Sequence, residues 1–219
     1  MADTYSSPQE SEKKLYYELF RPEIFNLIPK TTKRLLDVGC AEGVLAYEAK
    51  KKYNLEAAVG IEFIERAAEI AGTKLDRVLS GDIEQMKFDF SERYFDCIIC
   101  ADILEHLKNP WKELIRLKEI LDDKGVMIIS LPNLRHIIPI LKIIFNRFEY
   151  TDSEILDRTH LRFFTLHTMK KMFDDCGLRI ENISSNRSVS LKFRLANVIT
   201  LGLFKPFSVY QYIFLLKKK

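Results

Sequence analysis

Strand-length apolar runs alternate with helical stretches along most of this chain, and this alternation is the feature that most limits how it can fold. The runs predicted to be strands are RLLDVG (34–39), AAVGIE (57–62), DRVLSGD (76–82), FDCIICAD (95–102) and VMIISLP (126–132). Nearly continuous apolar character is typical of strands buried on both faces of a sheet. The pattern predicts an α/β protein with a mostly parallel sheet flanked by helices.

Helical signals separate the predicted strands. The predicted helices cover residues 43–53, 64–71, 109–125 and 165–177, and two last strands cover 178–184 and 207–216. Asn109 is a good N-cap because Pro110 follows it at the first helical position, and Thr165 can cap the later helix. Gly125 and Gly177 are expected to end these two helices.

The length of 219 residues suits one domain, and we expect residues 1–219 to form a single one. A tail and a helix that ends at Pro22 are expected within residues 1–30. Residues 133–162 interrupt the alternation and form an insert. The formal net charge is only +3, which gives little support to a nucleic-acid partner, because such proteins normally carry a strong basic excess.

The cysteines predict a reduced protein without a zinc site. Cys97 and Cys100 form a C-x-x-C inside a predicted buried strand, and no second pair follows at zinc spacing. We expect them to be buried as small hydrophobic side chains. The N-terminus has no apolar signal core, and no apolar run reaches the length of a membrane span. We therefore expect a cytoplasmic protein.

The residues that follow each predicted strand carry the functional signal, because ligands of parallel sheets bind beyond the carboxyl ends of the strands. Gly39 and Gly43 follow the first strand with the spacing G-x-x-x-G, and Ala41 stands between them. A dinucleotide fingerprint would need G-x-G-x-x-G around the pyrophosphate. The spacing therefore disfavours a diphosphate ligand and an NAD(P)-dependent oxidoreductase.

Acids at the ends of the second and third strands predict a nucleoside pocket. Glu62 is placed to accept both hydroxyls of a ribose, and Asp82 can accept from an adenine amino group. Ile83 can cover one face of the ring, and Phe63 or Ile64 can cover the other. Together these residues describe a pocket for an adenosine that lacks a diphosphate.

The motifs LLDVGCAEG, GDIE and FDCIICADILEHLKNP, with an acid ending the second strand, resemble those of the class I S-adenosylmethionine-dependent methyltransferases. The resemblance covers roughly Lys33 to Leu216. It implies a seven-stranded Rossmann-like sheet whose last strand is antiparallel, with S-adenosylmethionine bound over the first two strands. The carry-over places Asp37, Gly39, Ala41 and Gly43 on the methionine side, Glu62 at the ribose, Asp82 and Ile83 at the adenine, and backbone of Ala101 near the sulfonium.

The same resemblance implies that residues 133–162 form a helical lid over the substrate. His160 lies at the end of this insert, and histidine is suited to removing the proton of a hydroxyl nucleophile near neutral pH. We predict that His160 is the candidate base, with Asp157 or Arg158 orienting it or the substrate. The alternative is a structural histidine, with Asp157 paired to Arg162.

The stretch ADILEH offers a second catalytic hypothesis. The spacing of Asp102, Glu105 and His106 resembles the E-x-x-E-H of metal-dependent methyltransferases, including small-RNA 2′-hydroxyl and ubiquinone-pathway enzymes, some of which add a later histidine that His160 could match. Oxygen and imidazole ligands suit magnesium or manganese. Asp102 departs from the pattern because it is shorter than glutamate. Glu105 and His106 could instead begin a helix and pack.

Residues 134–148 are apolar on most sides and also carry Arg135, Lys142 and Arg147. A helix this apolar needs cover on more than one side, which its own domain, a homodimer partner or an anionic membrane surface would supply. Pro139 would kink this helix or start it.

The insert followed by DRTHLRFFT resembles methyltransferases of bacterial surface-polysaccharide and glycolipid pathways. We therefore expect O-methylation of a small-molecule or glycan hydroxyl. N-methylation of a small amine, metal-assisted RNA 2′-O-methylation and a catalytically silent cofactor-binding subunit are the alternatives.

Overall fold

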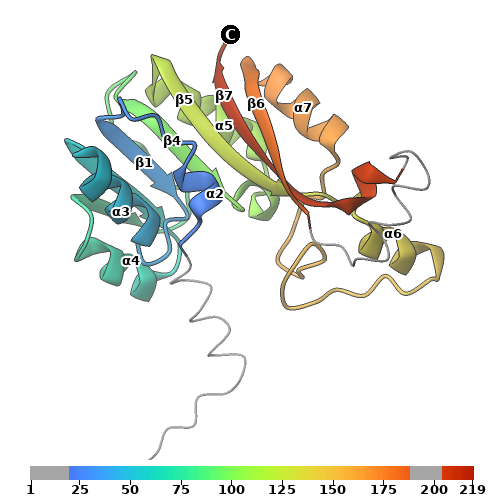
Figure 1. Ribbon diagram of the computed structural model, residues 1–219. Coiled ribbons are helices and arrows are strands. Elements are labelled where there is room, and N and C mark those ends of the chain that lie inside the picture. The colour runs from blue at the N-terminus through green and yellow to red at the C-terminus, as the bar shows by residue number, and fades with distance from the viewer. Residues whose placement is uncertain (1–19, 188–203) are drawn as a thin grey trace, which may run out of the picture.

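A computed structural model of the chain describes residues 20–187 and 204–219 (Figure 1). Its sheet has seven strands in the order β3-β2-β1-β4-β5-β7-β6. The strands are β1 (Arg34–Val38), β2 (Ala57–Glu62), β3 (Arg77–Ser80), β4 (Phe95–Ala101), β5 (Leu121–Pro132), β6 (Leu178–Arg187) and β7 (Val209–Lys218). Strands β1 to β5 pair in parallel, whereas β7 pairs antiparallel with both β5 and β6. The predicted Rossmann-like sheet with an antiparallel last strand is confirmed.

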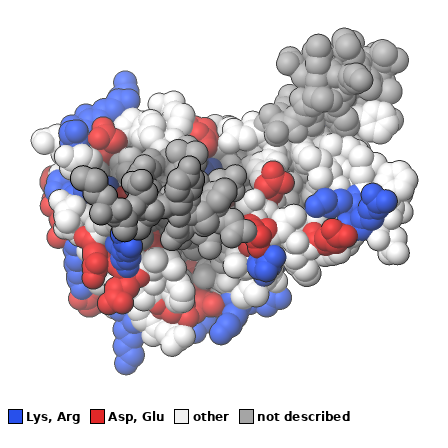
Figure 2. All heavy atoms as spheres, turned by 90° about the horizontal axis from the view of Figure 1, so that it is seen from below, with Lys and Arg blue, Asp and Glu red and all other residues white. Residues whose placement is uncertain are grey.

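Helices cover both faces of this sheet. They are α2 (Pro22–Phe25), α3 (Val44–Tyr53), α4 (Glu65–Gly72), α5 (Pro110–Ile120), α6 (Ile137–Ile144) and α7 (Leu166–Asp175), with 3-10 turns η1 (Leu104–His106) and η2 (Lys205–Ser208). In Figure 1, α2, α3 and α4 lie on one face of the sheet, α5 and α7 lie on the other, and α6 stands apart below the ends of the strands. Figure 2 views that lower side and shows red and blue side chains mixed over much of it, with white atoms at the right-hand rim.

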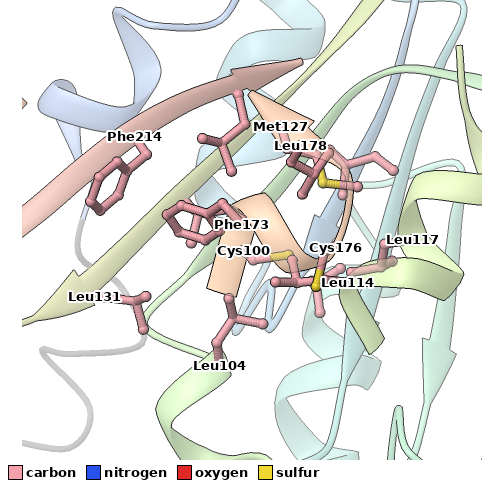
Figure 3. Close-up of a cluster of buried hydrophobic side chains, with 14 of the residues drawn as sticks. Cys100, Leu104, Leu114, Leu117, Met127, Leu131, Phe173, Cys176, Leu178 and Phe214 are labelled. Atoms are coloured by element: carbon pink, nitrogen blue, oxygen red, sulfur yellow. The ribbon is translucent and has the colours of Figure 1, made fainter. Parts of the chain in front are cut away.

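Two apolar clusters fill the space between the sheet and its helices. Neighbouring strand residues point to opposite faces, so Leu35 packs with α3 and Leu36 packs with α5. Figure 3 shows the larger cluster, where Phe173 of α7 lies near Phe214 of β7. Cys97 and Cys100 are buried as predicted and belong to opposite clusters. All four cysteines are free and buried.

One predicted helix boundary was wrong. The helix expected over 109–125 ends at Ile120, and β5 begins directly at Leu121, because Leu121 pairs beside Phe95 of β4. Gly125 is an extended residue of that strand. A side chain there would meet Leu121 and two backbone oxygens, so close packing accounts for this glycine rather than a helix cap.

At the N-terminus, Pro22 is the first residue of α2. Proline suits that position because the first helical N–H has no intrahelical partner. The helix predicted before it falls on residues 1–19, which lie outside the described residues. In the insert, Pro139 lies in the first turn of α6, which is consistent with a proline that starts this helix.

Candidate functional site

The loop after β1 turns through three residues with positive φ, namely Gly39 (71°), Ala41 (49°) and Gly43 (75°). Gly43 is the N-cap of α3, so the loop leads directly into the helix. A β-carbon at Gly39 would overlap the side chain of Ile103, which follows β4. Both backbone conformation and space therefore demand glycine at position 39.

Glu62 ties this glycine loop to the end of β2. The residue is buried, and its carboxylate accepts hydrogen bonds from the N–H of Ala41 at 2.8 Å and of Ile64 at 2.9 Å. Each carboxylate oxygen has two acceptor positions, so one position on each oxygen is left for another donor. In the structure, Glu62 therefore holds the glycine loop and the residues after β2 in place. Its role at a ribose stays a prediction.

Asp37 is a buried carboxyl in β1. Burial raises the pKa of Asp37 to about 7, and the charge of Glu62 adds to this increase, while the guanidinium of Arg21 opposes it. Asp37 can therefore carry a proton near neutral pH. A cationic group bound nearby would favour its charged form, which fits the expected position of the donor's amino group.

The residues expected around the adenine differ in how open they are. The Asp82 carboxylate accepts hydrogen bonds from the N–H of Glu84 at 2.9 Å and from Nε2 of Gln85 at 2.8 Å, so it closes the turn after β3. Phe63 has 68% of its surface exposed, whereas Ile83 is packed in the apolar core. Phe63 is thus more available than Ile83 to cover the ring.

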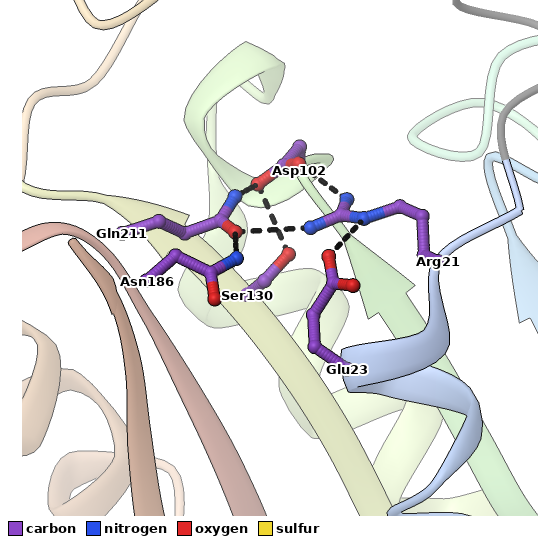
Figure 4. Close-up of polar contacts among 6 residues, drawn as sticks. All are labelled: Arg21, Glu23, Asp102, Ser130, Asn186 and Gln211. Carbon is purple, nitrogen blue, oxygen red and sulfur yellow. Dashed lines mark hydrogen bonds and ion pairs between the residues drawn. The ribbon is translucent and has the colours of Figure 1, made fainter. Parts of the chain in front are cut away.

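Ala101 ends β4, and the next residue, Asp102, has a positive φ of 56°. Figure 4 shows the Asp102 carboxylate receiving hydrogen bonds from Arg21 at 2.5 Å, from Ser130 at 3.0 Å and from Gln211. Three donors from three separate segments therefore hold this side chain. They stabilise a backbone conformation that is uncommon for residues other than glycine.

The same network reaches further along the chain. Arg21 also donates to Glu23 at 3.1 Å and to Gln211 at 3.0 Å, and Asn186 donates to Gln211 at 3.4 Å. It therefore joins the segment before α2 to strands β6 and β7 (Figure 4). The part of Arg21 was not predicted, since 81 positions separate it from Asp102 and no local pattern indicates their contact.

The hypothesis of a metal site at Asp102, Glu105 and His106 is revised by this geometry. The Asp102 oxygens are occupied by Arg21 and by two neutral donors. Glu105, His106 and His160 come together instead, with one potential ligand atom of each within 4.8 Å of the others. Two sequence-predicted histidines from distant segments therefore meet at one place.

The two imidazoles share a hydrogen-bond arrangement. Nδ1 of His160 lies 3.0 Å from the carbonyl oxygen of Ile155, so it must be protonated to donate there. Nδ1 of His106 lies 3.3 Å from the carbonyl oxygen of Thr159 and 3.1 Å from its hydroxyl. In this tautomer, Nε2 of each neutral ring carries a lone pair that can accept a proton or bind a metal.

Burial supports the neutral form of His106. Burial lowers the pKa of His106, and the neighbouring His160 lowers it further. The charge of Asp157 opposes this effect and raises the pKa of His106. Asp157 acts on the position of His106 instead, since its carboxylate accepts from the N–H of Thr159 at 2.7 Å and from the Thr159 hydroxyl at 2.6 Å. The Thr159 hydroxyl thus donates to Asp157 and can accept from His106. The D-x-T pattern of Asp157 and Thr159 in the sequence is a turn signal that indicates the contact between these two residues.

The alternative pairing of Asp157 with Arg162 was wrong, because the guanidinium of Arg162 donates to the carbonyl oxygen of Lys108 at 2.6 Å. Asp157 contacts His160 through the backbone, since the N–H of His160 donates to the carbonyl oxygen of Asp157 at 3.0 Å. Arg158, the other predicted orienting residue, pairs with Asp152 at 2.7 Å on the surface. The short reach of Asp157 within its own turn explains the difference.

Glu105 anchors the end of the insert. Its backbone carbonyl accepts the N–H groups of Leu161 at 2.8 Å and Arg162 at 3.0 Å. Its side chain is buried, and Oε2 has no hydrogen-bond partner among the described residues. Burial raises the pKa of Glu105 well above its usual value, and the charge of Asp102 raises it further. A buried acceptor without a hydrogen-bond donor is unfavourable, and a bound cation would supply the missing interaction.

Comparison with known proteins identifies the chain. A family model described as "Methyltransferase domain" matches residues 12–183. The chain belongs to the methyltransferase domain family. Membership implies S-adenosylmethionine as the methyl donor of this family member, in agreement with the strand-end residues. Within residues 20–187 and 204–219, none of its helices has the length and apolar character needed to cross a membrane.

Relatives in sequence and structure agree with this assignment. The methyltransferase is 30% identical over 156 residues to a ubiquinone biosynthesis O-methyltransferase of Rickettsia canadensis, which covers 68% of this chain and 64% of the relative. The chain thus spans less than two thirds of that relative's length.

Solved structures show the same fold. A SAM-dependent methyltransferase from Archaeoglobus fulgidus matches with a TM-score of 0.66 and 20% identity, covering 97% of this chain and 95% of the other. An S-adenosylmethionine-dependent methyltransferase from Mesorhizobium loti matches with a TM-score of 0.65 and 13% identity, covering 90% and 96%.

Proposed function

We propose that this methyltransferase transfers the methyl group of S-adenosylmethionine to a hydroxyl oxygen of a small-molecule acceptor. The observation that carries the proposal is the pair of imidazoles at His106 and His160, each held through Nδ1 with Nε2 left as an acceptor. An amine is already nucleophilic once neutral, whereas a hydroxyl needs its proton removed. The name of the Rickettsia canadensis relative supports oxygen as the acceptor atom.

The donor supplies an electrophilic methyl group on a sulfonium. We assign its methionine side to Asp37, Gly39, Ala41 and Gly43, because the glycine loop allows close approach of backbone and Asp37 can balance a cationic amino group. The β4 end, at Ala101, is assigned to the reacting centre.

The nucleoside of the donor is assigned to the ends of β2 and β3. Glu62 would accept from the ribose hydroxyls through the lone pairs that Ala41 and Ile64 leave unused. Asp82 would accept from the adenine amino group, and the exposed ring of Phe63 would cover one face of the base.

In the transfer step, Nε2 of His160 accepts the proton of the acceptor hydroxyl while the oxygen forms its bond to the methyl carbon. The carbon–sulfur bond breaks, and its electron pair remains on sulfur, so the products are a methyl ether and a neutral thioether. His160 then returns its proton to water. His106 stays neutral beside it, because burial lowers its pKa and two adjacent cationic rings would repel each other.

A matched set of acceptors tests the reaction type. The full chain is incubated with methyl-tritiated donor and, in turn, benzene-1,2-diol, benzene-1,2-diamine or methyl glucoside. Label in either hydroxyl compound is expected, and the two hydroxyl compounds distinguish an aromatic from a sugar acceptor. Label in the diamine alone would contradict the proposal.

A metal-assisted variant of this function is supported by a specific observation. Glu105, His106 and His160 offer one carboxylate and two imidazole nitrogens, and the buried Oε2 of Glu105 has no donor among the described residues. This donor set fits Mg²⁺ or Mn²⁺, which would acidify the acceptor hydroxyl when bound there. Asp102 is excluded from the set because Arg21 holds it.

Manganese supplies the probe for this variant. Binding of Mn²⁺ to the full chain is followed by electron paramagnetic resonance, and His106→Ala is expected to reduce it at least tenfold, while the exposed His167→Ala leaves it unchanged. Methyl transfer that is unaffected by chelator, together with no Mn²⁺ binding, would leave His160 as a metal-free base.

A further inference from the structure

The surface formed by α6 and the residues just after it is strongly apolar and exposed. Ile144 and Phe145 have 67% and 68% of their surface exposed, and the same character extends over Ile138, Leu141 and Ile143 of α6 and over Phe148 and Tyr150 just after it. We call these seven residues the α6 face. A packed lid would have covered them, so the expectation that the insert packs fully on its own domain does not hold for this helix.

Cations outnumber acids three to one along the α6 face. Residues 135–150, which span it, contain Arg135, Lys142 and Arg147 and a single acid, Glu149. These three charges equal the formal net charge of the whole chain, +3, so the remaining 31 basic and 31 acidic residues balance. None of the three cations has a carboxylate partner among the described residues, and Arg135 lies over the ring of Phe207 in η2 at 5.0 Å.

This charge pattern decides between the candidate partners. A two-fold dimer would place the α6 face of one copy against the same face of the other and so bring six cations together with only two acids. An anionic lipid surface offers the opposite charge and attracts each Lys or Arg near it. Charge complementarity therefore favours lipid over a second copy of this chain.

Geometry limits how the helix could meet a bilayer. The eight residues of α6 extend about 12 Å, far less than the roughly 30 Å of the hydrocarbon core. A short helix with apolar and basic side chains is suited to lying in the plane of the headgroups. In Figure 1, α6 projects from the rest of the molecule, and the white rim in Figure 2 lies on the same side.

The α6 face is also continuous with the candidate site. The ring of Phe148 lies 6.4 Å from that of Phe163, which lies 6.3 Å from the imidazole of His160. The ring of Tyr150 lies 6.5 Å from Phe163 on the same path. A row of rings thus leads from the exposed surface to the two histidines.

We propose that the α6 face docks on an anionic membrane surface, with its apolar side chains at headgroup level and Arg135, Lys142 and Arg147 facing the lipid phosphates. Membrane docking itself does not depend on the proposed function. Only its purpose rests on that function: docking would bring the site to a methyl acceptor held at the membrane surface.

Vesicle co-sedimentation of the full chain tests the docking. Vesicles of phosphatidylcholine alone are compared with vesicles that contain one quarter phosphatidylglycerol, at low and high salt. Wild type is expected to bind the anionic vesicles, and less so at high salt. The double variant Ile144→Glu with Phe145→Glu is expected to lower the partition coefficient at least tenfold, whereas Ile115→Glu, at an exposed apolar position on α5, leaves it unchanged.

A charge variant gives an independent measurement. Lys142→Gln is expected to lower the partition coefficient on anionic vesicles about fivefold and to leave binding to neutral vesicles unaltered, whereas Lys171→Gln on α7 changes neither. Absence of binding to anionic vesicles at low salt would overturn the proposal.

Two further results would also overturn it. One is a dimer in light scattering that the double variant dissociates while vesicles are not bound, since the face would then join two copies. The other is a melting temperature several degrees lower in the double variant, since the chain itself would then cover the face. Binding of S-adenosylhomocysteine, measured by calorimetry on the same samples, reports on the proposed function separately.

Discussion

The imidazole rings of His106 and His160 pack edge to face with their centres 4.7 Å apart, one at the end of β4 and the other at the end of the insert. Each ring is oriented by a carbonyl oxygen of the insert, Thr159 for His106 and Ile155 for His160. The insert therefore positions both rings, because its carbonyl oxygens lie against Nδ1 of each. This arrangement leads to the first of four predictions.

His160→Ala should lower the rate of methyl transfer about a hundredfold or more, because it removes the proposed proton acceptor. Binding of S-adenosylhomocysteine should be retained, since no residue assigned to the donor touches this ring. His167→Ala on α7 is the matched control, because that histidine is exposed. An unchanged transfer rate in His160→Ala would reduce this histidine to a scaffold of the insert.

Glu62→Ala should weaken binding of S-adenosylhomocysteine at least tenfold in calorimetry. The change removes the predicted ribose acceptor and also the two hydrogen bonds that hold Ala41 and Ile64. Glu69→Ala, at an exposed position in α4, should bind like wild type. Equal affinity of Glu62→Ala and wild type would show that the donor does not use the end of β2.

Asp37 should make stability depend on pH. Its pKa of about 7 in the folded protein exceeds the value of about 3.9 expected when unfolded, so the folded state holds the proton more tightly. The resulting stabilisation is fully present below the unfolded pKa and is lost as the pH rises to about 7. Within that window the loss is at most about 1.4 kcal/mol per pH unit.

The Asp37→Asn variant cannot lose a proton at position 37, so it lacks this loss of stability. The difference between its free energy of unfolding and that of wild type should therefore increase as the pH rises from 5 to 7. Urea unfolding at several pH values measures this difference. Asp175→Asn, at an exposed position, should follow the wild-type profile. Parallel profiles for Asp37→Asn and wild type would mean that Asp37 is ionised throughout.

Gly39→Ala should destabilise the protein by about 1 to 3 kcal/mol and lower its affinity for the donor, because the new β-carbon would overlap Ile103 at a backbone φ of 71°. Gly72→Ala is the control, since position 72 has open space and an ordinary φ, and it should be neutral or stabilising by up to about 1 kcal/mol. Thermal unfolding compares them. Similar melting temperatures for both variants would mean that the loop adapts at little cost.

Local signals in the sequence were sufficient where they describe one strand or one cap. The run AAVGIE is β2 from end to end, and the Asn109 side chain caps α5 by accepting from the N–H of Lys112 at 3.1 Å. The strand-end residues at Gly39, Glu62 and Asp82 were found because parallel strands bring their carboxyl ends to one edge. Burial, capping and strand direction act over a few residues, so a sequence records them directly.

Contacts between distant segments were decided only by the tertiary structure. From the sequence alone, Leu121 continues the helical pattern of α5, but in the fold it pairs beside Phe95 in the sheet. Asp102 fits the spacing of a metal ligand in the sequence, but in the fold Arg21 donates a hydrogen bond to its carboxylate. The meeting of His106 with His160 depends on the path of the whole insert. Each of these contacts is selected by packing and charge in three dimensions, and for that reason neither partner alone carries a pattern that predicts the other.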